Sequence, residues 1–111
     1  MTLVLTEISQ LGVVMAADSA VTTESGRVWT GMQKLLPIYK INAGISLWGV
    51  AEIDDQDADI WLQNFIDNSI PDGITLWDMA CLLASELNTA FGGPISERMG
   101  IHIGGGVNQR F

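Results

Sequence analysis

Short apolar segments near both ends of the chain predict β-strands, and the region between them predicts two helices. Residues 2–8 are rich in β-branched and apolar side chains, and residues 9–12 have the length of a hairpin connection. Residues 12–19 form a nearly continuous apolar run, which is typical of a strand buried on both faces. Three further strands are predicted at residues 34–38, 45–51 and 99–107. Pro37 has no N–H to donate and favours an edge position for the first of these.

Apolar residues recur with helical spacing in residues 60–66 and 76–90. Thr75, followed three residues later by Asp78, is a variant of the capping box that begins helices, and a Gly-Gly-Pro sequence ends the second helix. Cys81 lies within this helix and is predicted to be a small buried hydrophobic residue, not a nucleophile.

A cluster of acidic residues precedes the first helix and allows two interpretations: Glu52, Asp54, Asp55, Asp57 and Asp59. The cluster lacks the loop glycine and the distal glutamate of a calcium-binding EF-hand. Carboxylates near a helix N-terminus are stabilised by the helix dipole. A solvated helix start is therefore favoured over a metal site, and no metal or cofactor is predicted.

Three residues near the start of the chain offer a coherent chemistry: Thr2, Asp18 and Lys34. Removal of Met1 would make Thr2 the first residue, and its free α-amine could then take the proton of its own hydroxyl. A lysine about 4 Å away repels the protonated amine by roughly 4 kcal/mol at an effective dielectric of about 20, which lowers the pKa of the amine. An aspartate beside the lysine keeps the lysine charged and fixes its position.

These residues and their spacing resemble the proteasome β-type subunits and their bacterial relatives, the N-terminal nucleophile hydrolases. The matching features are Thr2 opening the first strand, the apolar run that ends at Asp18 with Thr22 following, and Lys34 before an apolar pair. Residues 45–51 resemble the strand that carries the oxyanion glycine of that family, which places this role on Gly49. The alternative is a packing glycine beneath the neighbouring tryptophan.

The resemblance implies an α+β fold, with residues 1–111 forming the N-terminal part of a four-layer αββα sandwich. Its strands would be mostly antiparallel, with two helices on one face. The later serine and aspartate of the family have no match in this sequence. We expect either a fragment, which is favoured, or a short relative that borrows strands from a partner. Because its apolar content is high and two helices cannot cover both sheets, the chain is expected to be inactive alone and prone to associate. The resemblance also implies substrate contacts for Ala20, Val21 and Thr22. The alternative for this polar segment is an ordinary exposed hairpin with a turn at residues 24–26.

Length and composition limit the partners. A chain of 111 residues is one domain, and its net charge of −8 argues against nucleic acid and anionic membranes as partners. No signal peptide is evident and no apolar run reaches about 18 residues, so a cytoplasmic location is expected. The chain is 48% hydrophobic and has four tryptophans, which suggests surfaces covered by other subunits, as in a homo-oligomeric ring, or by further sequence. A well-filled core with some exposed tryptophans is the alternative.

Two functions are compatible with these features. In the first, the protein is a threonine peptidase or amidase that acts on peptide or protein substrates. Thr2 attacks the substrate carbonyl, and Lys34 and Asp18 adjust the pKa of its amine. The Gly49 N–H donates a hydrogen bond to the oxyanion. In the second, it is a non-catalytic ring or scaffold subunit that kept the fold. His102 has no nucleophilic partner at a recognisable spacing and is expected to be structural or exposed.

Overall fold

The computed structural model describes residues 3–22, 28–92 and 99–105. The strands are β1 (Val4–Ser9), β2 (Gly12–Ala17), β3 (Ala20–Thr22), β4 (Val28–Thr30), β5 (Leu35–Ile38), β6 (Ala43–Trp48), β7 (Glu52–Ile53), β8 (Gln56–Asp57) and β9 (Gly100–Gly105). The helices are α1 (Ala58–Asn68), α2 (Leu76–Phe91) and a 3₁₀ turn at Tyr39–Ile41.

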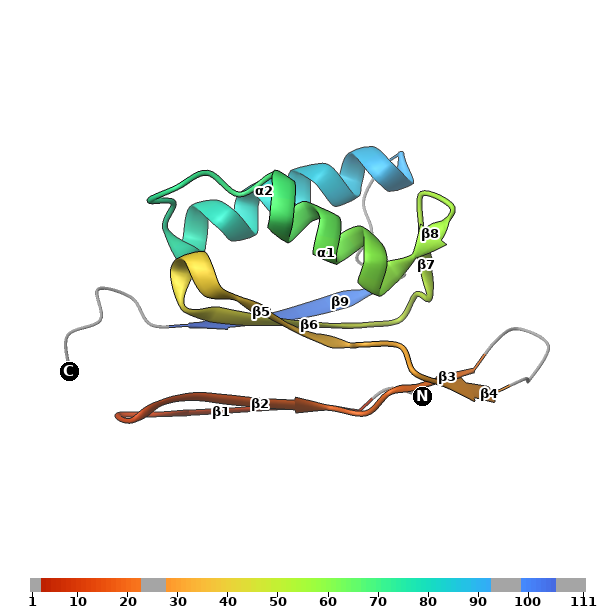
Figure 1. Cartoon of the computed structure of the whole chain (residues 1–111), viewed down its shortest axis with the longest axis horizontal. Coiled ribbons are helices and arrows are strands. Elements are labelled where there is room, and N and C mark those ends of the chain that lie inside the picture. The colour runs from red at the N-terminus through yellow and green to blue at the C-terminus, as the bar shows by residue number, and fades with distance from the viewer. Residues whose placement is uncertain (1–2, 23–27, 93–98, 106–111) are drawn as a thin grey trace.

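The elements form three layers (Figure 1). Strands β5, β6 and β9 form an antiparallel sheet in that order, and β5 occupies an edge, as Pro37 predicted. Helices α1 and α2 cover one face of this sheet, and the antiparallel hairpin β1–β2 lies along the opposite face. The fold is therefore α+β with antiparallel sheets and two helices on one side.

The core lies between the helices and the three-stranded sheet. Alternation along β6 turns Ile45 and Leu47 toward the helices, and both are almost completely buried. The helices contribute a matching apolar stripe: Leu62, Phe65, Ile66, Met79, Leu83 and Leu87. Complete burial of one such side chain contributes about 1.5–3 kcal/mol, so this interface is the main source of stability among the described residues.

Glycines in the sheet allow the hairpin to approach its other face closely. A Cβ added to Gly104 would lie 2.7 Å from Val13 Cγ1, and one added to Gly44 would lie 3.1 Å from Met15 Sδ. Side chains at these positions would push β2 away from the sheet.

One expectation for β2 is wrong. The strand was expected to be buried on both faces, but Val14 is 66% exposed and its neighbour across the hairpin, Glu7, is also exposed. The hairpin has only two strands, so one of its faces packs on the sheet and no described element covers the other. A continuous apolar run did not distinguish this arrangement from a central strand.

Helix α2 begins and ends as predicted, but its cysteine does not lie where expected. The Thr75 hydroxyl accepts a hydrogen bond from the Asp78 N–H at 3.1 Å, and Gly92 ends the helix with a φ of 71°. Cys81 is exposed and not buried. It follows the buried Met79 by two residues, and two residues are about 200° around a helix, so Cys81 faces away from the sheet.

Only part of the acidic cluster marks the helix start. Asp54 and Asp55 form the two-residue turn of the β7–β8 hairpin with φ values of 51° and 61°, a conformation that short hairpins require. Asp57 and Asp59 flank the first residue of α1, where carboxylates are favoured by the helix dipole.

The described residues contain no group of three side chains suited to a metal. None of the described helices is long and apolar enough to cross a membrane.

The close approach of the two sheets at Gly104 gives a testable prediction. Gly104→Ala should lower the free energy of unfolding by about 1–3 kcal/mol, because the new methyl group meets the stiff Val13 side chain. Gly44→Ala is the matched control: it restricts the unfolded chain equally but meets a flexible methionine sulfur. Urea denaturation of both variants measures the difference. Val13→Ala should rescue Gly104→Ala, and an additive double variant would contradict this explanation.

Candidate active site

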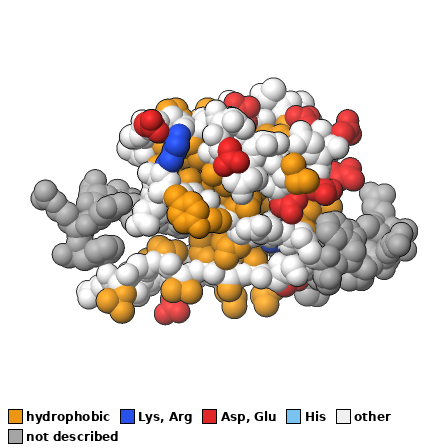
Figure 2. All heavy atoms as spheres, viewed as in Figure 1, with side chains coloured by type: hydrophobic (Ala, Val, Ile, Leu, Met, Phe, Trp, Pro, Cys, Tyr) orange, Lys and Arg blue, Asp and Glu red, His pale blue; other side chains and the backbone are white. Residues whose placement is uncertain are grey.

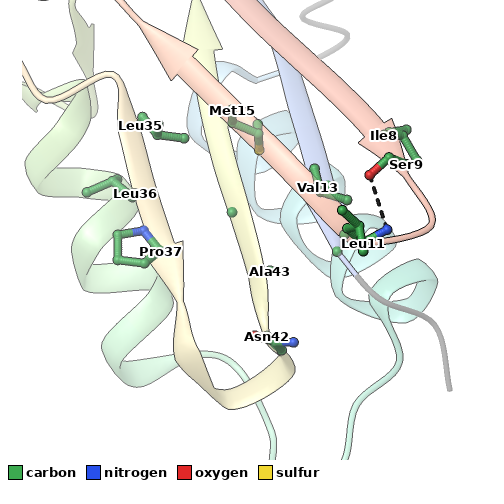
Figure 3. A pocket seen from close by; sticks show the side chains of 14 residues that line it. Ile8, Ser9, Leu11, Val13, Met15, Leu35, Leu36, Pro37, Asn42 and Ala43 are labelled. Carbon is green, nitrogen blue, oxygen red and sulfur yellow. Dashed lines mark hydrogen bonds between the residues drawn. The ribbon is translucent and has the colours of Figure 1, made fainter. Parts of the chain in front are cut away.

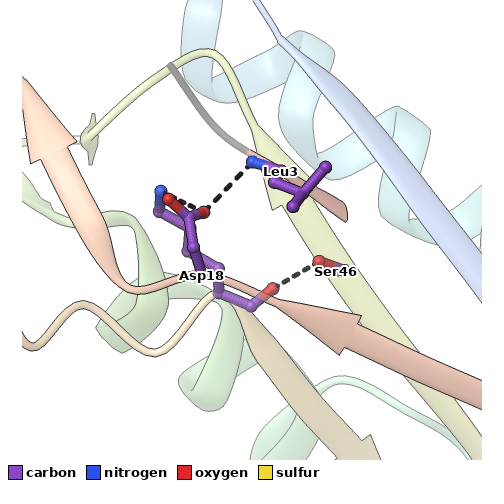
Figure 4. Close-up of polar contacts among 4 residues, drawn as sticks. Leu3, Asp18 and Ser46 are labelled. Atoms are coloured by element: carbon purple, nitrogen blue, oxygen red, sulfur yellow. Dashed lines mark hydrogen bonds and ion pairs between the residues drawn. The ribbon is translucent and has the colours of Figure 1, made fainter. Parts of the chain in front are cut away.

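Two strand ends bring Asp18 and Lys34 together. Asp18 follows β2 directly and Lys34 precedes β5 directly, and the Lys34 Nζ lies 3.1 Å from Asp18 Oδ1 (Figure 4). The side chain of Lys34 is 3% exposed, whereas that of Asp18 is 35% exposed. The ion pair therefore has a buried cation and an anion at the surface. An aspartate beside this lysine was predicted from the sequence, but the burial of the lysine was not.

Asp18 also binds the start of the chain. The Leu3 N–H donates to Asp18 Oδ1 at 3.1 Å, and the Asp18 N–H donates to the Leu3 carbonyl at 3.1 Å. The second of these bonds continues the β1–β2 ladder by one residue, and the first goes to the Asp18 side chain. The hydrogen bond from Lys34, and then that from the Leu3 amide, lower the pKa of the Asp18 carboxyl from its ordinary value of 3.8. Asp18 is therefore held ionised between the lysine and the residue that follows Thr2.

The backbone around Lys34 is fixed by three hydrogen bonds from other elements. The Ser46 hydroxyl donates to the Lys34 carbonyl at 2.7 Å, and the Leu47 N–H donates to the same oxygen at 3.2 Å. One residue earlier, the Gln33 N–H donates to Asp59 Oδ2 in the first turn of α1 at 3.1 Å. Sequence reasoning missed Ser46 and assigned Asp59 only to the helix start. A serine between two core residues was the available signal for Ser46.

Thr2 lies outside the described residues. Its carbonyl carbon is covalently bonded to the Leu3 nitrogen. The Leu3 nitrogen is the atom that bonds Asp18. The chain thus leads from the ion pair to Thr2 through one peptide unit, and the nucleophilic role of Thr2 remains a prediction.

Gly49 follows β6 with a φ of 104°, a conformation that favours glycine, and it is exposed. It lies two residues after Leu47, whose N–H donates to the Lys34 carbonyl. The glycine beneath the Trp48 indole is Gly100 of β9, where an added Cβ would lie 2.2 Å from the ring. Both interpretations of Gly49, as the oxyanion glycine and as a packing glycine, remain predictions.

The predicted substrate segment is a short strand. Ala20, Val21 and Thr22 form β3, which pairs with Val28–Thr30 and begins two residues after Asp18. The expected irregular hairpin is thus present as two paired strands, and its predicted turn at 24–26 lies outside the described residues. The substrate contacts remain a prediction.

His102 has a structural partner on the other sheet. It is exposed, and its Nδ1 lies 3.4 Å from the Thr6 hydroxyl oxygen, which links β9 to β1. An exposed, structural position is what the sequence predicted for this residue.

A cavity of about 730 Å³ lies between the two sheets, close to the β1–β2 turn (Figure 3). Its walls are mainly apolar and include Leu11, Val13, Leu35 and Pro37, and neither Asp18 nor Lys34 reaches it. The Ser9 hydroxyl in its wall already accepts a hydrogen bond from the Leu11 N–H. The cavity therefore lacks the charged groups of the ion-pair site.

Comparison of the chain with protein-family models, with curated proteins and with solved structures gives no match. The resemblance to the N-terminal nucleophile hydrolases thus depends on the residues named above. The structure adds the contact between Asp18, Lys34 and Leu3.

The lowered pKa of Asp18 predicts a pH-dependent stability. Because the carboxyl is more acidic in the folded chain than in the unfolded chain, its contribution is complete above about pH 4 and is lost as the pH falls through the lower folded-state pKa. Urea denaturation of the native chain between pH 2 and 7 should show this loss, and Asp18→Asn should remove it. Asp72→Asn is the control, because Asp72 pairs with Lys40 at 3.1 Å but is 93% exposed. Equal pH profiles for native chain and Asp18→Asn would contradict the assignment.

Proposed function

We propose that this protein is a threonine-type peptidase or amidase of the N-terminal nucleophile class, with Thr2 as nucleophile after removal of Met1. One observation carries the proposal: a single carboxylate oxygen of Asp18 binds both the buried Lys34 ammonium and the Leu3 amide. Leu3 is bonded to Thr2, so the arrangement joins a fixed cation to the residue whose amine must lose a proton.

Electrostatics supports this role for the pair. A free α-amine has an ordinary pKa of about 7.7–8.0 and is mostly protonated at neutral pH, so it is a poor base. A neighbouring ammonium disfavours a second positive charge and lowers the pKa of the amine. The Lys34 ammonium is buried, and the Asp18 carboxylate that pairs with it is 35% exposed, so the pair lies just beneath the surface.

In the proposed reaction, the Thr2 hydroxyl attacks the substrate carbonyl while the α-amine takes the hydroxyl proton. The oxyanion of the tetrahedral intermediate accepts a hydrogen bond from the Gly49 N–H, and one such donor is worth about 2.7–4 kcal/mol to the transition state. The amine then passes the proton to the leaving nitrogen, and an ester to Thr2 remains. Water then hydrolyses this ester: the amine takes a proton from the attacking water and gives a proton to the Thr2 oxygen as it leaves.

The layers are compatible with the αββα sandwich of that class. Helices, the β5–β6–β9 sheet and the β1–β2 hairpin supply three successive layers. Apolar side chains protrude from the free face of the hairpin, with Leu5 58% exposed (Figure 2). A fourth layer or a second subunit in a ring would cover this face, and we place such an assembly in the cytoplasm.

The exposed apolar face also favours a second candidate, a non-catalytic ring or scaffold subunit. In that case the Asp18–Lys34 pair would be structural. Intact mass of the purified protein tests the first candidate, because catalysis by Thr2 requires a chain without Met1 and a chain that retains Met1 would leave the second.

Because the 111-residue chain is expected to be inactive alone, this test uses the full-length protein. There, Thr2→Ala should reduce cleavage of fluorogenic peptides by several orders of magnitude and leave the circular dichroism spectrum unchanged, because only the nucleophile is lost. A β-lactone electrophile should add to the native chain at Thr2 and not to the variant, as intact mass would record. Thr6→Ala is the control, since Thr6 lies in β1, is exposed and carries the same hydroxyl group. Labelling or cleavage that persists in Thr2→Ala would reject Thr2 as the nucleophile.

Lys34→Met keeps most of the buried aliphatic volume and removes the charge. The amine pKa should then rise, and the acid limb of the pH–rate profile should move upward by as much as about three pH units. Lys40→Met removes a surface cation of the Lys40–Asp72 pair and should leave the profile in place. An unshifted profile for a folded Lys34→Met protein would exclude Lys34 from the mechanism.

A further inference from the structure

Ser46 is an unusual residue for its place in the fold. It lies in β6 between the core residues Ile45 and Leu47 and is 1% exposed. Among the described residues, Ser46 and Lys34 are the two polar or charged residues that are buried, and they are hydrogen-bonded to each other. A buried hydroxyl is unfavourable unless it is hydrogen-bonded. The volume of the Ser46 side chain alone therefore does not explain why a serine occupies this position.

The strand alternation turns Ser46 toward the hairpin layer, on the same side as Gly44 and opposite to the helix-facing Ile45. A small residue is needed on this side because β2 approaches closely. Glycine meets that need at position 44, and alanine would be the simplest apolar choice at 46. The serine adds a hydroxyl, which it donates to the Lys34 carbonyl at 2.7 Å.

The sheet does not need this hydroxyl to fix the pairing of β5 with β6. Four residue pairs from Leu35–Ser46 to Ile38–Ala43 set the register, and the Leu47 N–H already donates to the Lys34 carbonyl. The second donor makes the Lys34 carbonyl accept two hydrogen bonds from consecutive residues. Its specific effect falls on Lys34, the residue whose ammonium pairs with Asp18 at 3.1 Å.

We propose that Ser46 is a positioning residue that fixes the backbone of Lys34 and so holds the Lys34 ammonium against Asp18. For the reaction, this inference rests on the proposed function: a fixed ammonium keeps the Thr2 amine unprotonated, and a displaced one does so less well. In this proposal Ser46 acts through Lys34, whose carbonyl it binds.

The test is Ser46→Ala, which removes the hydroxyl and little volume. In the 111-residue chain, carbon-detected NMR titration should show the Asp18 pKa rising toward its ordinary value of 3.8, because the lysine is held less firmly. Ser46→Cys keeps a weak donor and should give a smaller rise, and it supplies the comparison if the alanine variant does not fold. Thr89→Ala is the matched control: it removes another hydroxyl-to-carbonyl bond, to Ser85 at 3.1 Å, and should leave the Asp18 pKa unchanged.

A purely structural role would give a different result. Ser46→Ala would then lower the melting temperature without moving the Asp18 pKa, and that outcome overturns the proposal. In a peptidase assay, Ser46→Ala should also shift the pH optimum upward. Absence of peptidase activity in the native protein, together with a raised Asp18 pKa in Ser46→Ala, would reject the proposed function and support the positioning of Lys34.

Discussion

A buried positive charge is the constraint on which the rest of the site depends. Lys34 is 4% exposed, and an ammonium removed from water must be compensated by an anion and by hydrogen bonds. Asp18 supplies the anion from the end of β2, while Ser46 and Leu47 fix the lysine backbone from β6. The charge therefore ties the hairpin layer to the central sheet at one point, and the start of the chain is bonded to that same point through Leu3.

The two faces of the central sheet carry side chains of different size. Toward the helices, β6 presents large apolar side chains such as Ile45 and Leu47, which make a conventional core. Toward the hairpin it presents Gly44 and Ser46, which let β2 come close enough for Asp18 to reach Lys34. The ion pair and the close packing of the sheets are thus two results of the same alternation of large and small residues.

Features set by local chemistry could be predicted from the sequence. The Thr75 cap and the edge position of Pro37 follow from neighbouring residues alone. The Asp18–Lys34 contact was also predicted, because the resemblance supplied the spacing. The exposed face of β2 and the outward direction of Cys81 were missed because they depend on which elements lie opposite. Burial and hydrogen bonds establish the Asp18–Lys34 pair. The two functional hypotheses differ at Thr2, which lies outside the described residues.

The pairing of β6 with β9 joins positions far apart in the chain, from Trp48–Gly100 to Ala43–Gly105, and both helices lie between them. During synthesis, β6 has an unpaired edge until the last of these residues has left the ribosome. Such long-range pairing is slow, because the loop must close before its contacts form. An open edge that has already packed on its helices can accept the β9 strand of another molecule, so this connection is the place where two nascent chains would exchange strands.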